Sequence, residues 1–387
     1  MSQKILFSII YIVKHFMVLL KLGFSRKPII CFLYGEGTYI DIYINIYKKL
    51  LEFDDSIRIV WLFTPLPGIH FDRRIEKDIF LPTTLTRLLK KCIIITASIA
   101  RIRQSPSITY IGIMHGFASF GSVVDVKLIH LYDKIFLSTP YQYFQLTRGA
   151  YKNRYNKNDL VKVGYPRIDK LIQSFPDSYE IKNRAVFYGP TYHIDISSIF
   201  EYLFPLIRYT AKRNIKLYIK LHPFLYNKEN YEHSGKIDWV TLINEVSMKH
   251  NHISLLEAHI PCNEVVELFK KTDYCITDCS GLGYEYSLVT GKPTVWLGNK
   301  LKIPLKDIKS KKTEVYSSFQ EVKYRGIIGP IIPEVNDLDQ DLDKFVREIN
   351  QYSAQLKKFR NEFTFNLGNA APLAAQTILD LVYKKIH

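Results

Sequence analysis

The chain has 387 residues, 47% of them hydrophobic, and its 53 Lys and Arg against 37 Asp and Glu give a formal net charge of +16. This length exceeds one ordinary hydrophobic core and fits two domains of roughly 150 residues each. The positive charge favours anionic partners such as phospholipid headgroups, nucleotides or polyanionic polymers. Nucleic-acid binding is disfavoured, because the sequence has no helix-turn-helix pattern, zinc-finger spacing or RNP-like aromatic signature.

The first predicted element is an apolar run from Ile5 to Leu22. Lys14 and His15 interrupt the run, which argues against a membrane-spanning helix, since a lysine at mid-bilayer costs about 2.5 to 3.5 kcal/mol. A signal peptide is disfavoured because no small-residue cleavage site follows. An interfacial helix and a helix of the domain core are both consistent with the run, and we predict that residues 1–27 associate with the membrane surface.

From Pro28 onward, short β-branched runs alternate with longer helical stretches, which is typical of βα units with a parallel sheet. The first series of predicted strands covers Ile29–Tyr34, Ile57–Phe63, Ile93–Thr96, Ile108–Met114, Lys134–Ser138 and Leu160–Gly164. The second series covers Ala185–Tyr188, Ile215–Leu221, Ile253–Leu256, Tyr274–Thr277 and Thr294–Leu297. We therefore expect two Rossmann-like domains, residues 28–175 and 184–335, facing each other across a cleft. A helical segment is expected over 336–387.

The sequence predicts no metal site. Cys275 and Cys279 lack a second Cys or His pair at metal-binding spacing. Four alternate aspartates from Asp337 to Asp343 fall at a predicted helix start, where the helix dipole stabilises acidic side chains without a metal ion. The odd number of cysteines, most of them in apolar runs, favours a reducing compartment.

The most informative segment, Tyr274–Leu297, predicts a strand, a Ser/Gly turn, a helix and another strand. Ser280, Gly281 and Gly283 are small, so backbone N–H groups at the helix start can approach a diphosphate closely, with the helix dipole assisting. Glu285 follows one turn into the helix, where its carboxylate can bind the ribose hydroxyls of a nucleotide. The alternative is an ordinary βαβ turn whose glycines serve packing.

Polar residues also follow the neighbouring predicted strands, at the carboxyl ends where open α/β sheets bind ligands. His222 lies directly before Pro223, which stops the strand, and its imidazole can donate to a phosphate oxygen. Thr191 follows the preceding strand and offers a hydroxyl and a backbone N–H to the same place. For His222, the alternative is a structural histidine.

In the first half, His115 and Gly116 end a predicted strand, and the glycine leaves the imidazole with little steric cover. His115 is the candidate general base, because an imidazole titrates near neutrality and can take a proton from an attacking hydroxyl. Arg167 can neutralise developing phosphate charge, and Asp169 can orient its guanidinium. The alternative for His115 is an ordinary loop histidine.

Seven pieces occur in a characteristic order: the Gly35–Asp41 turn with the Ile57–Phe63 strand, His115-Gly116, Gly164–Asp169, Gly189–Tyr192, Leu221–Pro223, Thr277–Ser280 and Gly291–Pro293. Together they resemble the CDP-glycerol glycerophosphotransferases of teichoic-acid synthesis, over about Pro28 to Pro330. The resemblance implies a GT-B fold, no metal or other cofactor, a CDP-linked donor in the C-terminal half and a lipid- or polymer-linked acceptor nearer the N-terminal half. It also implies peripheral attachment to the anionic, cytoplasmic face of the membrane.

By the same resemblance, His115 is the essential histidine beside the acceptor, with Gly116 on the acceptor side. The predicted donor-binding residues are Thr191, His222, Thr277, Ser280, Gly281 and Glu285. The family usually has tyrosine and a second serine around Ser280, where this chain has Cys279 and Gly281. These departures leave the alditol of the donor open, with CDP-ribitol as one alternative to CDP-glycerol.

We therefore predict a transferase of cell-envelope or capsule polymer synthesis. An acceptor hydroxyl attacks the β-phosphorus of the CDP-linked donor, His115 removes the proton, and CMP leaves; positioning and charge stabilisation come from Arg167, His222 and the Ser280 helix start. The alternatives are a GT-B glycosyltransferase using a nucleotide sugar, a nucleotide-sugar 2-epimerase with a similar Ser/Gly turn, and a basic scaffold protein without turnover.

Overall fold

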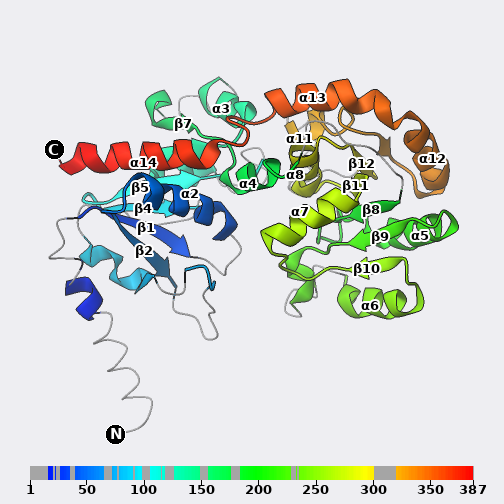
Figure 1. The fold of residues 1–387 in the computed structure, drawn as a ribbon, viewed down its shortest axis with the longest axis horizontal. Coiled ribbons are helices and arrows are strands. Elements are labelled where there is room, and N and C mark those ends of the chain that lie inside the picture. The colour runs from blue at the N-terminus through cyan, green and yellow to red at the C-terminus, as the bar shows by residue number, and fades with distance from the viewer. Residues whose placement is uncertain are drawn as a thin grey trace, which may run out of the picture. The chain divides into compact units, whose positions relative to one another are not determined.

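The computed structural model describes residues 16–20, 22, 27–34, 40–64, 72–75, 78–89, 92–97, 105–114, 116–117, 126–148, 156–175, 184–227, 232, 235–299 and 320–386. The chain divides into two compact units. Unit 1 comprises Met1–Gly116, Val123–Lys170 and Thr364–His387, and unit 2 comprises Phe117–Ser122 and Leu171–Phe363. Each unit is an α/β structure around one parallel sheet (Figure 1).

The sheet of unit 1 has the strand order β3-β2-β1-β4-β5-β6-β7, and every pairing is parallel. Its strands are β1 (Ile29–Tyr34), β2 (Arg58–Phe63), β3 (Ile79–Pro82), β4 (Cys92–Thr96), β5 (Thr109–Ile113), β6 (Lys134–Leu137) and β7 (Leu160–Lys162). β4 and β5 are buried along their whole length, which explains their near-continuous apolar sequences. The sequence did not predict β3, a four-residue edge strand whose conformation depends on pairing with β2.

Within the described residues, the helices of unit 1 are α2 (Ile40–Phe53), α3 (Pro140–Thr147) and α14 (Ala370–Ile386), and α4 (Asp169–Ile172) crosses the boundary to unit 2. The 3-10 turns described in unit 1 are η1 (Thr83–Leu88), η2 (Val126–Leu131), η3 (Lys157–Asp159) and η4 (Pro166–Ile168). α14 packs along α2, and Tyr383 near its end donates a hydrogen bond to Asp54. The segment 336–387, predicted as one helical segment, is therefore divided: residues up to Phe363 belong to unit 2 and the rest to unit 1. The physical reason is the apolar stripe of α14, which is buried against unit 1.

The sheet of unit 2 has the order β10-β9-β8-β11-β12-β13, again with every pairing parallel. Its strands are β8 (Ala185–Tyr188), β9 (Lys216–Ile219), β10 (Ile253–Leu255), β11 (Tyr274–Thr277), β12 (Thr294–Leu297) and β13 (Ile331–Ile332). The two-residue β13 was not predicted, because so short a strand is defined by its pairing with β12 alone. In both sheets the first strand lies in the interior and the order reverses beside it, as in Rossmann-like sheets.

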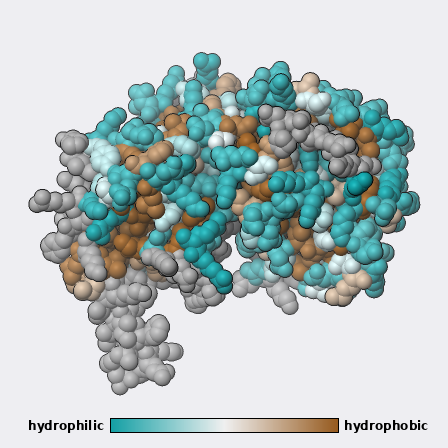
Figure 2. Space-filling model, viewed as in Figure 1, coloured by the Kyte–Doolittle hydropathy of each residue, from teal (hydrophilic) through white to brown (hydrophobic). Residues whose placement is uncertain are grey.

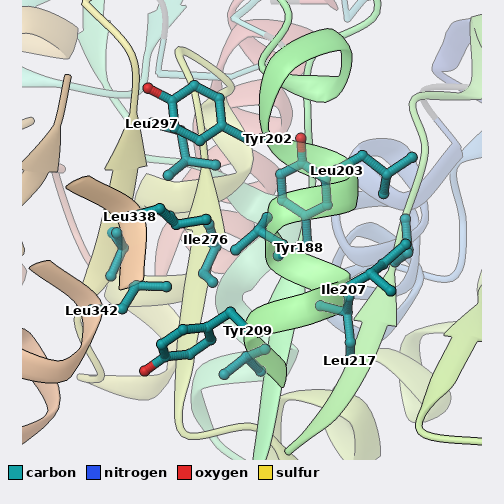
Figure 3. Packing of buried hydrophobic residues seen from close by; sticks show 14 of the residues in the cluster. Tyr188, Tyr202, Leu203, Ile207, Tyr209, Leu217, Ile276, Leu297, Leu338 and Leu342 are labelled. Atoms are coloured by element: carbon teal, nitrogen blue, oxygen red, sulfur yellow. The ribbon is translucent and has the colours of Figure 1, made fainter. Parts of the chain in front are cut away.

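In the part of unit 2 that the structure describes, the helices are α5 (Ile199–Lys212), α6 (Trp239–Lys249), α7 (Cys262–Lys271), α8 (Gly281–Thr290), α11 (Gln320–Lys323), α12 (Leu338–Glu348) and α13 (Ser353–Glu362), with 3-10 turns at η5 (Pro223–Tyr226), η7 (Val335–Asp337) and η8 (Ile349–Tyr352). One hydrophobic core joins α5, α12 and the sheet, with the side chains of Tyr202, Leu203 and Ile207 on α5 facing the strands (Figure 3). Leu338 and Leu342 contribute from α12 to the same core (Figure 3).

The surface is largely hydrophilic on the face drawn in Figure 2, with smaller hydrophobic areas between the polar residues. Phe16, Met17 and Leu20 of the predicted membrane-associating segment are exposed, whereas Leu22 is buried. Residues 1–15, 21 and 23–26 of that segment lie outside the described residues. None of the helices in the described parts of the chain combines the length and apolar character needed to cross a bilayer.

Candidate functional site

The predicted donor residues gather where the strand order of unit 2 reverses, between β8 and β11. Connections from these two strands leave in opposite directions, because β8 leads to β9 and β11 leads to β12. Open parallel sheets bind ligands in the crevice at this point, outside the carboxyl ends of the strands. Thr191 follows β8, Thr277 ends β11 and Ser280 begins the next connection. The structure therefore brings residues distant in sequence to one edge of one sheet.

Ser280 and Gly281 form the start of α8. Ser280 is the N-cap residue, and its hydroxyl accepts the N–H of Leu282 at 3.3 Å. A Cβ placed on Gly281 would meet nothing within 4 Å, so the first turn of the helix is open to a ligand there. A Cβ on Gly283 would lie 2.8 Å from the side chains of Thr277, Thr294 and Trp296. Gly281 thus permits approach to the helix start, whereas Gly283 permits close packing of α8 on the sheet.

Asp278 holds this site together, and the sequence analysis gave it no role. Its buried carboxylate accepts the N–H of Thr191 at 3.0 to 3.1 Å, the N–H of Ser198 at 2.9 Å and the Ser198 hydroxyl at 3.0 Å. It also accepts the N–H of Cys279 at 2.7 Å. Burial raises the pKa of Asp278, while these donors oppose the rise. Asp278 therefore ties the segment after β8 to the turn after β11.

Thr277 and Thr191 form further hydrogen bonds at the same edge of the unit 2 sheet. The Thr277 hydroxyl donates to the carbonyl of Gly189 at 2.6 Å, and Thr277 is fully buried. The carbonyl of Thr191 accepts the Ser197 hydroxyl at 2.7 Å. Both threonines lie where donor binding was predicted, and the hydrogen bond of the Thr277 hydroxyl to Gly189 makes it part of the scaffold of the site.

His222 follows β9, the strand next to β8, and caps η5. Its Nδ1 accepts the backbone N–H of Phe224 at 3.2 Å. The imidazole packs against Tyr192, whose ring centroid lies 4.6 Å away. Because Tyr192 adjoins Thr191, His222 lies near the segment that Asp278 anchors.

Glu285, the fifth residue of α8, is buried at 6% exposure, and its binding of ribose stays a prediction.

The predicted catalytic residues Arg167 and Asp169 and the predicted acceptor-side residue Gly116 lie in unit 1. The predicted general base, His115, lies outside the described residues. The carbonyl of Gly116 accepts a hydrogen bond from the Gln142 side chain at 3.3 Å, and a Cβ on Gly116 would meet nothing within 4 Å. Arg167 is half-buried within η4. Its part in charge stabilisation stays a prediction.

Asp169 has a contact that the sequence did not predict. Its Oδ2 accepts the N–H of Ala371 at 2.6 Å, at the start of α14. Burial raises the pKa of Asp169 to about 6, although hydrogen bonds from Ala371 and Ala370 oppose the rise. The residue was expected to orient Arg167; the structure shows it fastening α14 to unit 1, and the orienting role stays a prediction.

No group of three or more His, Cys, Asp or Glu in the described ranges is arranged to hold a metal ion. Two of the aspartates near the start of α12 engage basic side chains instead. Asp343 accepts both Nε and Nη2 of Arg213, at 2.7 and 2.5 Å, and Asp339 lies 3.5 Å from the Lys212 ammonium.

A family model described as CDP-Glycerol:Poly(glycerophosphate) glycerophosphotransferase matches residues 14–382. The chain belongs to this family. It is accordingly a glycerophosphotransferase-like enzyme, and the resemblance found in its sequence is confirmed. No curated protein matches the chain significantly.

Solved structures similar to this glycerophosphotransferase share its fold. One is described as the wall teichoic acid polymerase TagF, with 17% identity, a TM-score of 0.63, and coverage of 94% of this chain and 90% of the other. A TagF variant described as soaked with CDPG has 16% identity, a TM-score of 0.59 and coverage of 94% and 90%. A UDP-GlcNAc 2-epimerase from Neisseria meningitidis, bound to UDP-GlcNAc, has 11% identity, a TM-score of 0.54 and coverage of 92% and 100%.

Arg325 is a further residue of the glycerophosphotransferase that the sequence analysis missed. Its buried guanidinium donates to the carbonyl of Leu297 at 3.0 Å and to that of Gly298, at the carboxyl end of β12. Burial lowers the pKa of Arg325, while nearby Cys279 and other acidic groups oppose that shift. A buried positive charge thus lies near Cys279 in the turn before α8, and a single arginine in an irregular segment gives no sequence pattern that could reveal it.

Proposed function

We propose that the enzyme transfers glycerol phosphate, or a related alditol phosphate, from a CDP-linked donor to a hydroxyl of a lipid- or polymer-linked acceptor. The observation that carries the proposal is the open helix start at Ser280 and Gly281, at the strand-order reversal of unit 2. Such a helix start suits the diphosphate of a nucleotide donor. The family match and the TagF structure described with CDPG support glycerol as the alditol.

In the proposed reaction, the acceptor oxygen forms a bond to the β-phosphorus while the bond from that phosphorus to the CMP oxygen breaks. His115 takes the proton of the acceptor hydroxyl, and CMP leaves with the electron pair. His222 and the N–H groups at the start of α8 donate hydrogen bonds to the donor phosphates, and Arg167 neutralises the negative charge that develops on them. No metal or other cofactor enters the proposal.

The proposal extends to the place of action. We assign the enzyme to the cytoplasmic face of the membrane as a peripheral protein, in teichoic-acid or capsule polymer synthesis. Support comes from the net charge of +16, which favours anionic lipid headgroups, and from the exposed side chains of Phe16, Met17 and Leu20.

The test is incubation of the full chain with CDP-glycerol, CDP-ribitol and a panel of nucleotide sugars, each with a short synthetic acceptor. Mass spectrometry of the product should show a new phosphodiester, with one CMP released per linkage. His115→Ala should lower turnover by about 10² to 10⁴-fold, the range for loss of a general base. His130→Ala, a substitution of an exposed histidine on η2, is the matched control and should keep activity. A phosphate-free linkage would instead establish a glycosyltransferase.

A further inference from the structure

The imidazole of His222 is held on several sides. Its Nδ1 accepts the N–H of Phe224 at 3.2 Å. Its ring centroid lies 4.6 Å from that of Tyr192 and 5.2 Å from that of Phe224. The rings of Tyr192 and Phe224 pack edge to face, with ring centroids 4.9 Å apart and an interplanar angle of 75°. Pro223 fixes the backbone directly after the histidine. The ring orientation is therefore defined by packing as well as by hydrogen bonding.

The hydrogen bond from Phe224 also determines which nitrogen carries the proton. A neutral imidazole has one N–H donor and one acceptor nitrogen. Because Nδ1 accepts, the proton lies on Nε2. His222 therefore presents Nε2–H as its donor position, which suits a phosphate oxygen.

Tyr192 connects this histidine to the donor turn. It follows Thr191, whose N–H donates to the buried carboxylate of Asp278 at 3.0 to 3.1 Å. Asp278 in turn accepts the N–H of Cys279, the residue before Ser280. One chain of contacts therefore runs from the start of α8 to the ring of His222, and Tyr192 is its last member.

We propose that Tyr192 is a positioning residue: its ring holds the imidazole of His222 in the one orientation in which Nδ1 accepts the Phe224 amide, which selects the tautomer, and Nε2–H meets a donor phosphate. The proposal rests on the donor-binding role of His222 in the proposed function. Tyr192 itself need not touch the donor.

A double-mutant cycle in the full chain tests this assignment. Tyr192→Leu removes the aromatic ring, and His222→Gln removes the imidazole. With CDP-glycerol as donor, Tyr192→Leu should raise KM for the donor by about two- to tenfold, as expected for losing an aromatic pair, with a smaller change in kcat. In the His222→Gln background the same substitution should change KM no further, because the residue acts through the histidine. Tyr192→Phe retains the ring and should restore most of the affinity.

Nitrogen NMR of histidine-labelled protein provides a readout that does not require turnover. The His222 signals, assigned by their loss in His222→Gln, should show Nε2–H alone in the wild type and a mixture of tautomers in Tyr192→Leu. Tyr218→Leu removes a half-buried tyrosine from β9 and should leave both readouts unchanged. An unchanged tautomer in Tyr192→Leu, or an equal rise of KM in both backgrounds, would overturn the proposal. If His222→Gln leaves donor KM unchanged, the donor role of His222 fails, and the NMR result still decides whether Tyr192 orients the ring.

Discussion

Two buried aspartates show how single residues organise this enzyme. Asp278 accepts hydrogen bonds from Thr191, Ser198 and Cys279, and Asp169 accepts the N–H of Ala371. In both places a loop or helix start presents backbone N–H groups that water cannot reach. Leaving such a donor unsatisfied costs about 1 to 3 kcal/mol, so a buried acceptor stabilises the local conformation even where its charge is unfavourable. Each aspartate is therefore explained by the donors around it.

Asp169 leads to a prediction about pH. Burial raises its pKa from 3.8 to about 6. Between these values the folded chain holds a proton that the unfolded chain has released, so the free energy of unfolding falls as pH rises through this window. Over the whole window, the free energy of unfolding falls by about 3 kcal/mol. Asp169→Asn keeps an acceptor oxygen for Ala371 without a charge, so its stability relative to the wild type should increase from pH 4 to pH 7.

Urea unfolding at several pH values between 4 and 7 measures this difference. Asp380→Asn, on the exposed side of α14, is the control and should follow the wild-type pH dependence. Parallel stability curves for Asp169→Asn and the wild type would show that the ionisation of Asp169 is not linked to folding.

At the scale of elements, α8 has an open first residue and a closely packed third one. Its first residue, Gly281, faces open space, and two residues later Gly283 lies against β11 and β12. Gly291, in the left-handed conformation at φ 70°, ends the helix. The sequence shows the glycines, but only their surroundings distinguish one that leaves the helix start open from one that permits close packing.

Matched alanine substitutions should separate these two roles. Gly283→Ala places a methyl group 2.8 Å from three side chains and should cost about 1 to 3 kcal/mol of stability through overpacking. Gly281→Ala has room for its methyl group and should leave the unfolding free energy within about 1 kcal/mol of the wild type. It should nevertheless weaken CDP binding, because the methyl group projects where a phosphate would approach.

Thermal unfolding and titration with CDP measure the two effects on the same proteins. A destabilised Gly281→Ala variant with normal affinity for CDP would contradict the assignment of the open helix start as the phosphate site. Cytidine, which carries no phosphate, should bind Gly281→Ala and the wild type equally well.

At the scale of the whole molecule, the chain completes unit 1 only at its end. It leaves unit 1 after Lys170, forms unit 2, and returns with residues 364–387. The return is fixed near its beginning, where the N–H of Phe365 and the hydroxyl of Thr364 both donate to the carbonyl of Ser138. The folding of unit 1 therefore depends on its most distant sequence segment.

Truncating a buried side chain of α14 should destabilise unit 1 selectively. Ile378 is fully buried, and Ile378→Ala should cost about 2 to 5 kcal/mol. Hydrogen exchange followed by mass spectrometry should show loss of protection in α2 and β4, with the strands of unit 2 retaining theirs. Gln376→Ala, on the exposed side of the same helix, is the control. Equal loss of protection in both units would show that they unfold together.

Most strands could be predicted from the sequence because they are buried on both faces and therefore read as continuous apolar runs. β3 and β13 could not: β3 is a partly exposed edge strand that ends in a proline, and β13 has two residues and is defined by its pairing with β12. The turn at Ser280 and the position of His222 after β9 were also accessible, because a helix start and a strand end are local features. These features and the order of the motifs sufficed to identify the family.

Only the tertiary structure decided which groups Asp278, Tyr192 and Arg325 contact. Their contacts join segments separated by tens of residues, as between Asp278 and Thr191. The same holds for α14: its apolar stripe predicts burial, but no local pattern states that its partner is α2, more than 300 residues earlier. A sequence by itself thus determines which groups must be buried or satisfied, whereas the packing of distant segments determines what buries and satisfies them.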